Sequence, residues 1–450
     1  MASRHDLVSV LVAVSGRTRA QDAISSVLEQ TYRPLELIVV GGAADAEAAL
    51  AARRAALRSA RGAYVTLLDG DDVLLPAKIA RQAAILDASP HLGAVRCRFH
   101  DMDVAGRVVD SAGRQPDGDL RAELLRSHLP WSGGPLVRRE LLLGIGEDEP
   151  LDWFSDWGLW LRVALDGHDF GCVQEPLGGR RASPRYLTHH EVAARERSVV
   201  CVLEQAFRRW ALPAEVMARR EEIHATWSVR FACRHAVAES AAGVERSLVR
   251  AATLSPGWGG DPRPVIELLH DEAMHPEVRA GDPVRMIETV LDHLPPAFAS
   301  ARAARSDLIA RVHLALALQA HAGGDRGAAR SHLACALTAS PELLEAPDRF
   351  AAVLVGHARR IAAADPRSFV ARVLATLPPV ADGLERARAL ALAEVAIADT
   401  VRAHRLPVER RRAACVVSAA GMHRAEVMLR AERRMPGRLV ERLRHANPRR

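Results

Sequence analysis

Three short, mainly apolar segments alternate with helical patterns in the first seventy residues. They are Leu7–Val14, Leu35–Val40 and Ala63–Leu68, and all three contain β-branched residues. Apolar runs of this length are typical of strands that are buried on both faces, as in a parallel sheet covered by helices. The order strand, helix, strand, helix therefore predicts an α/β domain with a mostly parallel, Rossmann-like sheet.

A change of pattern near residues 185–205 predicts a domain boundary. Strand and helix signals alternate before it, whereas Ala-, Leu- and Arg-rich amphipathic helices follow it to the end of the sequence. At 450 residues the chain is also too long for one compact core. We therefore expect an α/β domain over 1–190, a linker helix over 191–221 and an all-helical domain over 222–450.

The helical part contains an internal repeat. The segment Gly281–Pro296 (GDPVRMIETVLDHLPP) is echoed 83 residues later by Ala364–Pro379 (ADPRSFVARVLATLPP), and Val244–Pro256 is echoed 85 residues later by Ala329–Pro341. Within one unit, Val312–Pro341 resembles a tetratricopeptide helix pair. Recurring helical units predict an α-solenoid-like domain. Its predicted units are about 222–304, about 306–388 and a partial unit over 389–450.

The residues Asp69-Gly70-Asp71-Asp72 form the most specific motif. They follow the third predicted strand, and Pro76 then opens a helix. Ligands bind at the carboxyl ends of strands in an open parallel sheet, and clustered carboxylates suit a hard divalent cation. The alternative is an acidic turn that only stabilises the N-terminus of the following helix.

The surroundings of this motif resemble the family 2 glycosyltransferases, which have the GT-A fold. The matching text runs from Val8 to Leu177 in the family's order and reads VSVLVAVSGR, AISSVLEQTYRPLELIVV, ARGAYVTLLDGDDVLLPAKIARQAAIL, GPLVRREL, SDWGLWLRVALDG and VQEPL. The resemblance implies transfer of a sugar, with inversion, from a nucleotide-sugar donor to an acceptor. A glycan, a lipid and a protein all remain open as acceptors, and the helical domain is expected to present the acceptor or bind a protein partner.

The resemblance also implies roles for individual residues. Asp69 and Asp71 would be the carboxylates that bind Mg²⁺ or Mn²⁺ under the nucleotide diphosphate, with Asp72 beside them. Asp156 would stand where the family's general base accepts the proton of the acceptor hydroxyl. Arg53 falls on the family's arginine near the diphosphate.

Two further positions of the implied nucleotide-sugar site carry unusual residues. Ser15 begins the pair that replaces the family's aromatic residue and asparagine, and Gly41 stands where the family has the aspartate that reads the nucleotide base. The segment from Val40 to Ala52 is also shorter than usual. These departures support an alternative function, a catalytically inactive GT-A-like scaffold whose helical repeats bind protein partners.

Several candidates have structural explanations as well. Asp156 fits the start of a helix whose Trp157 and Trp160 form an apolar face, so the tryptophans are interpreted as core residues. The pair Arg180-Arg181 suits a diphosphate but equally a solvated turn. The pair His189-His190 is interpreted as part of a solvated linker, because adjacent histidines cannot easily share a metal.

Composition argues against other classes of function. Lys78 is the only lysine, so the net charge of +6 comes from arginine, and an aromatic content of 4% argues against a nucleic-acid partner. The six cysteines lack CxxC spacing, which predicts reduced thiols.

No apolar run is long enough for a bilayer and the first residues lack a secretory pattern, so we expect a cytoplasmic protein. The basic tail Arg433–Arg450 adds a weaker expectation of peripheral contact with the inner membrane surface.

Overall fold

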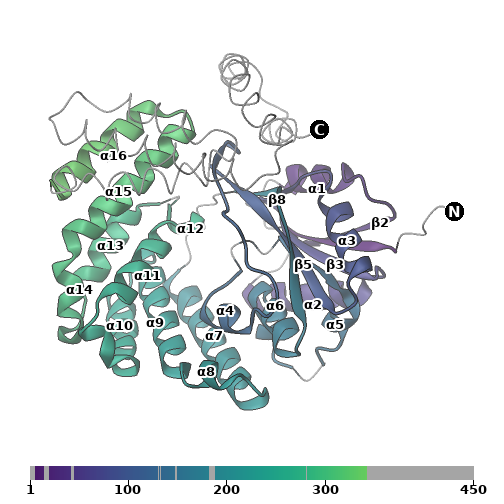
Figure 1. Ribbon diagram of the computed structural model, residues 1–450, viewed down its shortest axis with the longest axis horizontal. Coiled ribbons are helices and arrows are strands. Elements are labelled where there is room, and N and C mark those ends of the chain that lie inside the picture. Colours follow the sequence, from purple (N-terminus) through teal and green to yellow (C-terminus); the bar gives the residue numbers. More distant parts are fainter. Residues whose placement is uncertain are drawn as a thin grey trace, which may run out of the picture. The chain divides into compact units, whose positions relative to one another are not determined.

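The computed structural model (Figure 1) describes residues 6–14, 20–41, 45–129, 131, 133–146, 149–181, 188–279 and 281–341. The chain divides into two compact units. The first contains the described residues up to Gly106 and those from Arg114 to Arg305. The second contains Arg107–Gly113 and the described residues from Ser306 onward.

The first unit contains a mixed sheet. Its strands are β1 (Val8–Val14), β2 (Leu35–Gly41), β3 (Tyr64–Asp69), β4 (Val73–Leu74), β5 (Leu92–Met102), β7 (Leu136–Arg138) and β8 (Asp169–Arg181). They lie in the order β2-β1-β3-β7-β5-β8-β4. The three strands predicted from apolar runs, β2, β1 and β3, are parallel neighbours, which confirms the α/β class.

Antiparallel pairing enters through two short strands. β7 runs antiparallel to both β3 and β5, and β4 runs antiparallel to β8, while β5 and β8 are parallel. The sheet is therefore more mixed than the sequence pattern indicates. Strands of two or three residues show no periodicity from which their direction could be predicted.

Helices accompany these strands and continue beyond them (Figure 1). Those among the strands are α1 (Ala20–Leu28), α2 (Ala46–Ser59), α3 (Lys78–Ala88), α4 (Arg121–Arg126), α5 (Arg139–Leu143), the 3₁₀ segment η1 (Leu151–Phe154) and α6 (Asp156–Leu165). After β8 come α7 (His189–Arg209), α8 (Ala214–Met217), α9 (Arg220–Val237), α10 (Ala241–Leu254), η2 (Pro256–Gly259), α11 (Arg263–Ala273), α12 (Pro276–Arg279), α13 (Pro283–Asp292), η3 (Pro296–Phe298) and α14 (Ala299–Ala303).

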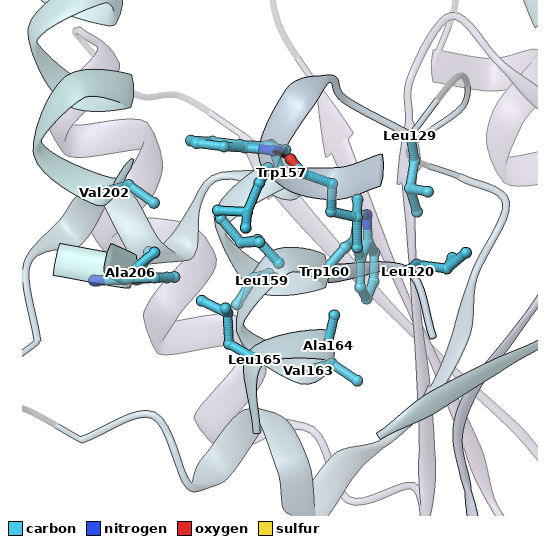
Figure 2. Packing of buried hydrophobic residues seen from close by; sticks show 14 of the residues in the cluster. Leu120, Leu129, Trp157, Leu159, Trp160, Val163, Ala164, Leu165, Val202 and Ala206 are labelled. Carbon is cyan, nitrogen blue, oxygen red and sulfur yellow. Dashed lines mark hydrogen bonds between the residues drawn. The ribbon is translucent and has the colours of Figure 1, made fainter. Parts of the chain in front are cut away.

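One apolar core joins the sheet to the first helices that follow it. Figure 2 shows Trp157 and Trp160 of α6 in the same cluster as Val202 and Ala206 of α7. Trp227 of α9 belongs to this cluster too. The core therefore holds α6 between the sheet and the helices that follow it. This also holds Asp156, the first residue of α6, in place. The predicted domain limit at residue 190 stays a prediction.

The second unit contains β6 (Val108–Ser111), α15 (Arg305–Ala322) and α16 (Arg326–Ala339). The last two form the hairpin predicted over Val312–Pro341. Gly324 adopts a φ of 83° in the turn, a conformation that favours glycine, and Asp325 caps α16 by accepting a hydrogen bond from the Ala328 amide at 2.9 Å. Its likeness to a tetratricopeptide pair stays a prediction.

The repeat can be followed in its first copy only. Gly281–Pro296 contains α13 and the start of η3. Its echo at Ala364–Pro379, the partial third unit and the basic tail Arg433–Arg450 all lie outside the described residues.

In the described part of the chain no helix is long and apolar enough to cross a membrane, and the cysteines are free thiols.

Candidate active site

A pocket opens where the parallel strands end. Because β1, β2 and β3 are parallel, their carboxyl ends meet at this edge, where α/β sheets bind ligands. The pocket is lined by Leu11 and Ala13 of β1, Val40 of β2, Leu67, Leu68 and Asp69 of β3, Arg53 of α2 and Asp156 of α6. The structure thus brings together three predicted site residues, Arg53, Asp69 and Asp156.

Arg53 and Asp156 form an ion pair in this pocket. Their side chains are 18% and 26% exposed, so the pair is shielded from water but still reaches the pocket. Asp156 is the first residue of α6, where the helix dipole favours a negative charge. Ser155 is the N-cap, since its hydroxyl accepts a hydrogen bond from the Gly158 amide at 3.0 Å. Asp156 is therefore a first-turn acid and not the cap.

The rest of α6 serves as an anchor. Trp157 and Trp160 are 4% and 1% exposed, and the Trp157 indole N–H donates to the Leu124 carbonyl at 2.7 Å. These contacts confirm their interpretation as core residues. Gly158 lies so close to η1 that a Cβ atom there would come within 2.6 Å of the Asp152 carbonyl oxygen. A larger residue at position 158 would therefore require α6 or η1 to shift.

The three carboxylates after β3 occupy different environments. Asp69 is exposed, Asp71 is half-buried and Asp72 is 4% exposed. Of the three, only Asp69 is among the described residues that line the pocket. Of the three carboxylates, Asp69 is therefore the one that a cation in the pocket would contact.

Asp72 is held inside the protein. The Trp131 indole N–H donates to Asp72 Oδ2 at 2.8 Å, and the Arg181 amide donates to Asp72 Oδ1 at 2.9 Å. Burial, followed by the nearby negative charge of Asp69, raises the pKa of Asp72 to about 8. Asp72 stabilises the turn through these bonds, and its predicted part in nucleotide binding stays a prediction.

Arg180 and Arg181 both lie in β8 and not in a solvated turn. Arg180 pairs with Asp101 at 2.8 Å, and its guanidinium lies 4.9 Å from the centre of the Phe99 ring. The Arg181 side chain is only 3% exposed and is described below. His189 and His190 begin α7 as exposed residues, directly after Thr188, which forms a capping box with Glu191.

The predicted nucleotide positions are only partly described. Gly41 ends β2 beside Val14 of β1, and a Cβ atom at Gly41 would lie 3.0 Å from the Val14 carbonyl oxygen, which leaves little room for a side chain. Ser15 and residues 42–44 lie outside the described residues. Asp45, the nearest acid in sequence, caps α2 by accepting a hydrogen bond from the Ala48 amide at 2.8 Å.

Asp69 and Asp71 are the candidate cation ligands. The described residues contain no cluster of three or more His, Cys, Asp or Glu side chains that could hold a metal ion by themselves. Mg²⁺ commonly uses one or two carboxylates and completes its coordination with water and substrate phosphates. The chemistry of these two donors therefore fits a cation that binds together with a phosphate-bearing ligand.

Trp131 is the site-associated residue that sequence reasoning missed. Its indole N–H donates a hydrogen bond to Asp72 Oδ2, although 59 residues separate the two in the sequence. The only local signal was Gly178-Gly179 in β8, because a Cβ atom at Gly178 would lie 2.1 Å from the Trp131 ring. A glycine pair of this kind indicates that another group packs closely against the strand, but the sequence does not show which residue that is.

Comparison with known proteins finds a partial match to one family model. Residues 46–142 match the family model described as Glycosyl transferase family 2. A 129-residue segment is 22% identical to the uncharacterized glycosyltransferase MJ1057 of Methanocaldococcus jannaschii. That match covers 28% of this chain and 44% of the relative, so this chain spans less than half the length of the relative it matches.

Solved structures give weaker likenesses. S. aureus TarS is 16% identical with a TM-score of 0.37, over 73% of this chain and 55% of that chain. TarS 1–349 in complex with UDP-GlcNAc is 14% identical with a TM-score of 0.37, over 73% and 90% of the two chains. The mannosyltransferase PcManGT from Pyrobaculum calidifontis, in complex with GDP-Man and Mn²⁺, is 18% identical with a TM-score of 0.35, over 65% and 88%.

Proposed function

We propose that this chain, whose residues 46–142 carry the glycosyl transferase family 2 pattern, transfers a sugar from a nucleotide-sugar donor to an acceptor with inversion. One observation carries the proposal. Arg53, Asp69 and Asp156 come from three separate segments and line one pocket at the carboxyl ends of parallel strands. The resemblance assigns these residues to the diphosphate, the cation and the base, and such a reaction needs all three groups in one place.

Asp156 is the general base of the proposed reaction. Its carboxylate accepts the proton of the acceptor hydroxyl as that oxygen attacks the anomeric carbon of the donor sugar. The position at the start of α6 favours the ionised carboxylate, which is the form that accepts a proton. The buried tryptophans of α6 hold the helix, so the base keeps a fixed position relative to Asp69.

Arg53 binds the donor diphosphate, since a guanidinium matches phosphate oxygens in shape and charge. Asp69 and Asp71 hold the divalent cation, Mg²⁺ or Mn²⁺. When bound, such a cation neutralises the charge that develops on the leaving diphosphate. Asp69 is exposed at the end of β3 and can reach a ligand without any change in the core.

One observation favours the alternative, an inactive scaffold whose helical part binds protein partners. Gly41 offers no carboxylate to read a nucleotide base, and the carboxylate of Asp45 is already used to cap α2. On this alternative the pocket residues would serve only to hold α2, α6 and the sheet together.

Thermal unfolding of the full-length chain with UDP or GDP, each with and without Mn²⁺, separates the two functions. A ligand that binds only the native state must raise the Tm. We expect one nucleotide to raise the Tm when Mn²⁺ is present, and Asp69→Asn to remove that rise. The matched control is Asp271→Asn on α11, where the aspartate side chain is 65% exposed and lies outside the pocket lining. A wild-type Tm that neither nucleotide changes contradicts the proposal and favours the scaffold.

A further inference from the structure

Trp131 lies against the carboxylate turn and has no role in the resemblance. It is 3% exposed, and its N–H reaches Asp72 Oδ2 at 2.8 Å. Its ring packs 5.6 Å from the Phe99 ring, and the ammonium nitrogen of buried Lys78 lies 5.8 Å from its centre. A buried indole N–H needs an acceptor, and Asp72 Oδ2 supplies it. Trp131 thus fixes the side chain of Asp72.

Arg181 of β8 holds the same turn from a second side. Its amide donates to Asp72 Oδ1 at 2.9 Å, and its Nε donates to the carbonyl of Asp71 at 3.0 Å. Its Nη2 donates to Asp22 Oδ2 on α1, also at 3.0 Å. One buried arginine therefore ties the backbone of the turn to both β8 and α1.

Gly178 makes room for this arrangement. A Cβ atom there would lie 2.1 Å from Cη2 of Trp131 and 2.8 Å from the Val73 carbonyl oxygen. The next residue, Gly179, pairs with Val73 of β4, directly after the turn. Strand β8 thus packs closely on the indole ring while it pairs with β4, which leaves the ring little freedom to move.

We infer that Trp131, Asp72 and Arg181 form a latch that positions Asp69 and Asp71 for the divalent cation and the donor diphosphate, an inference that rests on the proposed function. The three are positioning residues: their side chains are buried and act through the turn between Asp69 and Asp72. A site built from two carboxylates depends on the distance between them. Groups hydrogen-bonded directly to metal ligands typically contribute about 10–100-fold to metal affinity, and Trp131, which acts one residue further away through Asp72, should have an effect at the lower end of that range.

Trp131→Phe tests the latch, because it removes the indole N–H and keeps an aromatic ring. Trp227→Phe is the matched control: Trp227 is also 3% exposed and donates its N–H at 2.8 Å, to the carbonyl of Leu125 outside the turn. Both full-length variants are titrated calorimetrically with MnCl₂ in the presence of UDP or GDP, whichever stabilises the wild type. Hydrogen–deuterium exchange is measured on the same proteins without ligand.

We expect Trp131→Phe to weaken Mn²⁺ binding about tenfold and to speed exchange of the Asp72 and Arg181 amides. Trp227→Phe should leave Mn²⁺ affinity unchanged, and it should speed exchange of these two amides only as far as it lowers global stability. Unchanged exchange at these amides, unchanged Mn²⁺ affinity, or an equal loss of affinity in both variants would each overturn the inference. If the wild type binds no nucleotide with Mn²⁺, the proposed function fails, and unchanged exchange in Trp131→Phe would show separately that the latch fails as well.

Discussion

Arg53 on α2 and Asp156 at the start of α6 form an ion pair in the pocket at the ends of the parallel strands. The pair joins the proposed phosphate-binding group to the proposed base. A donor phosphate that binds Arg53 would compete with Asp156 for the guanidinium. The Asp156 carboxylate would then be available to the acceptor hydroxyl.

Asp156→Asn should stop transfer and spare donor binding. The amide keeps the shape of the side chain and cannot accept the proton, so the rate should fall about 10²–10⁴-fold. Release of UDP or GDP from nucleotide sugars measures the rate, and the rise in Tm with nucleotide and Mn²⁺ measures donor binding. Asp271→Asn again serves as the control. Transfer at the wild-type rate in Asp156→Asn would rule out Asp156 as the base.

Arg53→Ala should weaken nucleotide binding while the fold survives. Both side chains of the ion pair are mostly shielded from water, so removing Arg53 should lower the free energy of unfolding by more than the about 1 kcal/mol that is typical of exposed pairs. Arg58→Ala is the control, since Arg58 is exposed near the end of the same helix and is not among the pocket residues. Equal nucleotide affinity in the two variants, measured by calorimetry, would remove Arg53 from the donor site.

Asp71→Ala and Asp72→Ala should separate binding from stability. Asp71→Ala should abolish stabilisation by nucleotide with Mn²⁺ and lower the free energy of unfolding by at most about 1 kcal/mol. Asp72→Ala leaves the N–H groups of Trp131 and Arg181 without their carboxylate acceptor, at a cost of about 1–3 kcal/mol for each buried group. Urea unfolding of the ligand-free proteins measures both values. A larger loss in Asp71→Ala than in Asp72→Ala would contradict the structure.

Stability should fall as the pH falls below about 6.5, in part because of His100. Burial, followed by the positive charge of Arg98, lowers the pKa of His100 to about 4, and the side chain is 5% exposed. Between these two pKa values the unfolded chain binds a proton that the folded chain does not, so protonation favours unfolding by up to about 1.4 kcal/mol per pH unit.

His100→Phe keeps a ring of similar size and removes this titration. The slope of unfolding free energy against pH between 6.5 and 4 should therefore become shallower than in the wild type. Equal slopes in wild type and His100→Phe would show that His100 does not contribute.

The parts of the fold that could be predicted are those with a local pattern. β1 and β3 follow from apolar runs, because strands buried on both faces must be apolar along their length. The stripe of Trp157 and Trp160 likewise indicated the buried face of α6. Antiparallel β7 could not be predicted, because three residues carry no pattern of direction.

The candidate site divides in the same way. The sequence by itself placed Asp69 at the ligand edge of the sheet, because that position depends only on where a buried strand ends and on the parallel order of its neighbours. Only the tertiary structure decided that Arg53 meets Asp156, and that Asp72 is buried between Trp131 and Arg181. The partners of Asp72 lie 59 and 109 residues away in the chain, and the residues around an aspartate do not encode which distant groups the fold will pack against it.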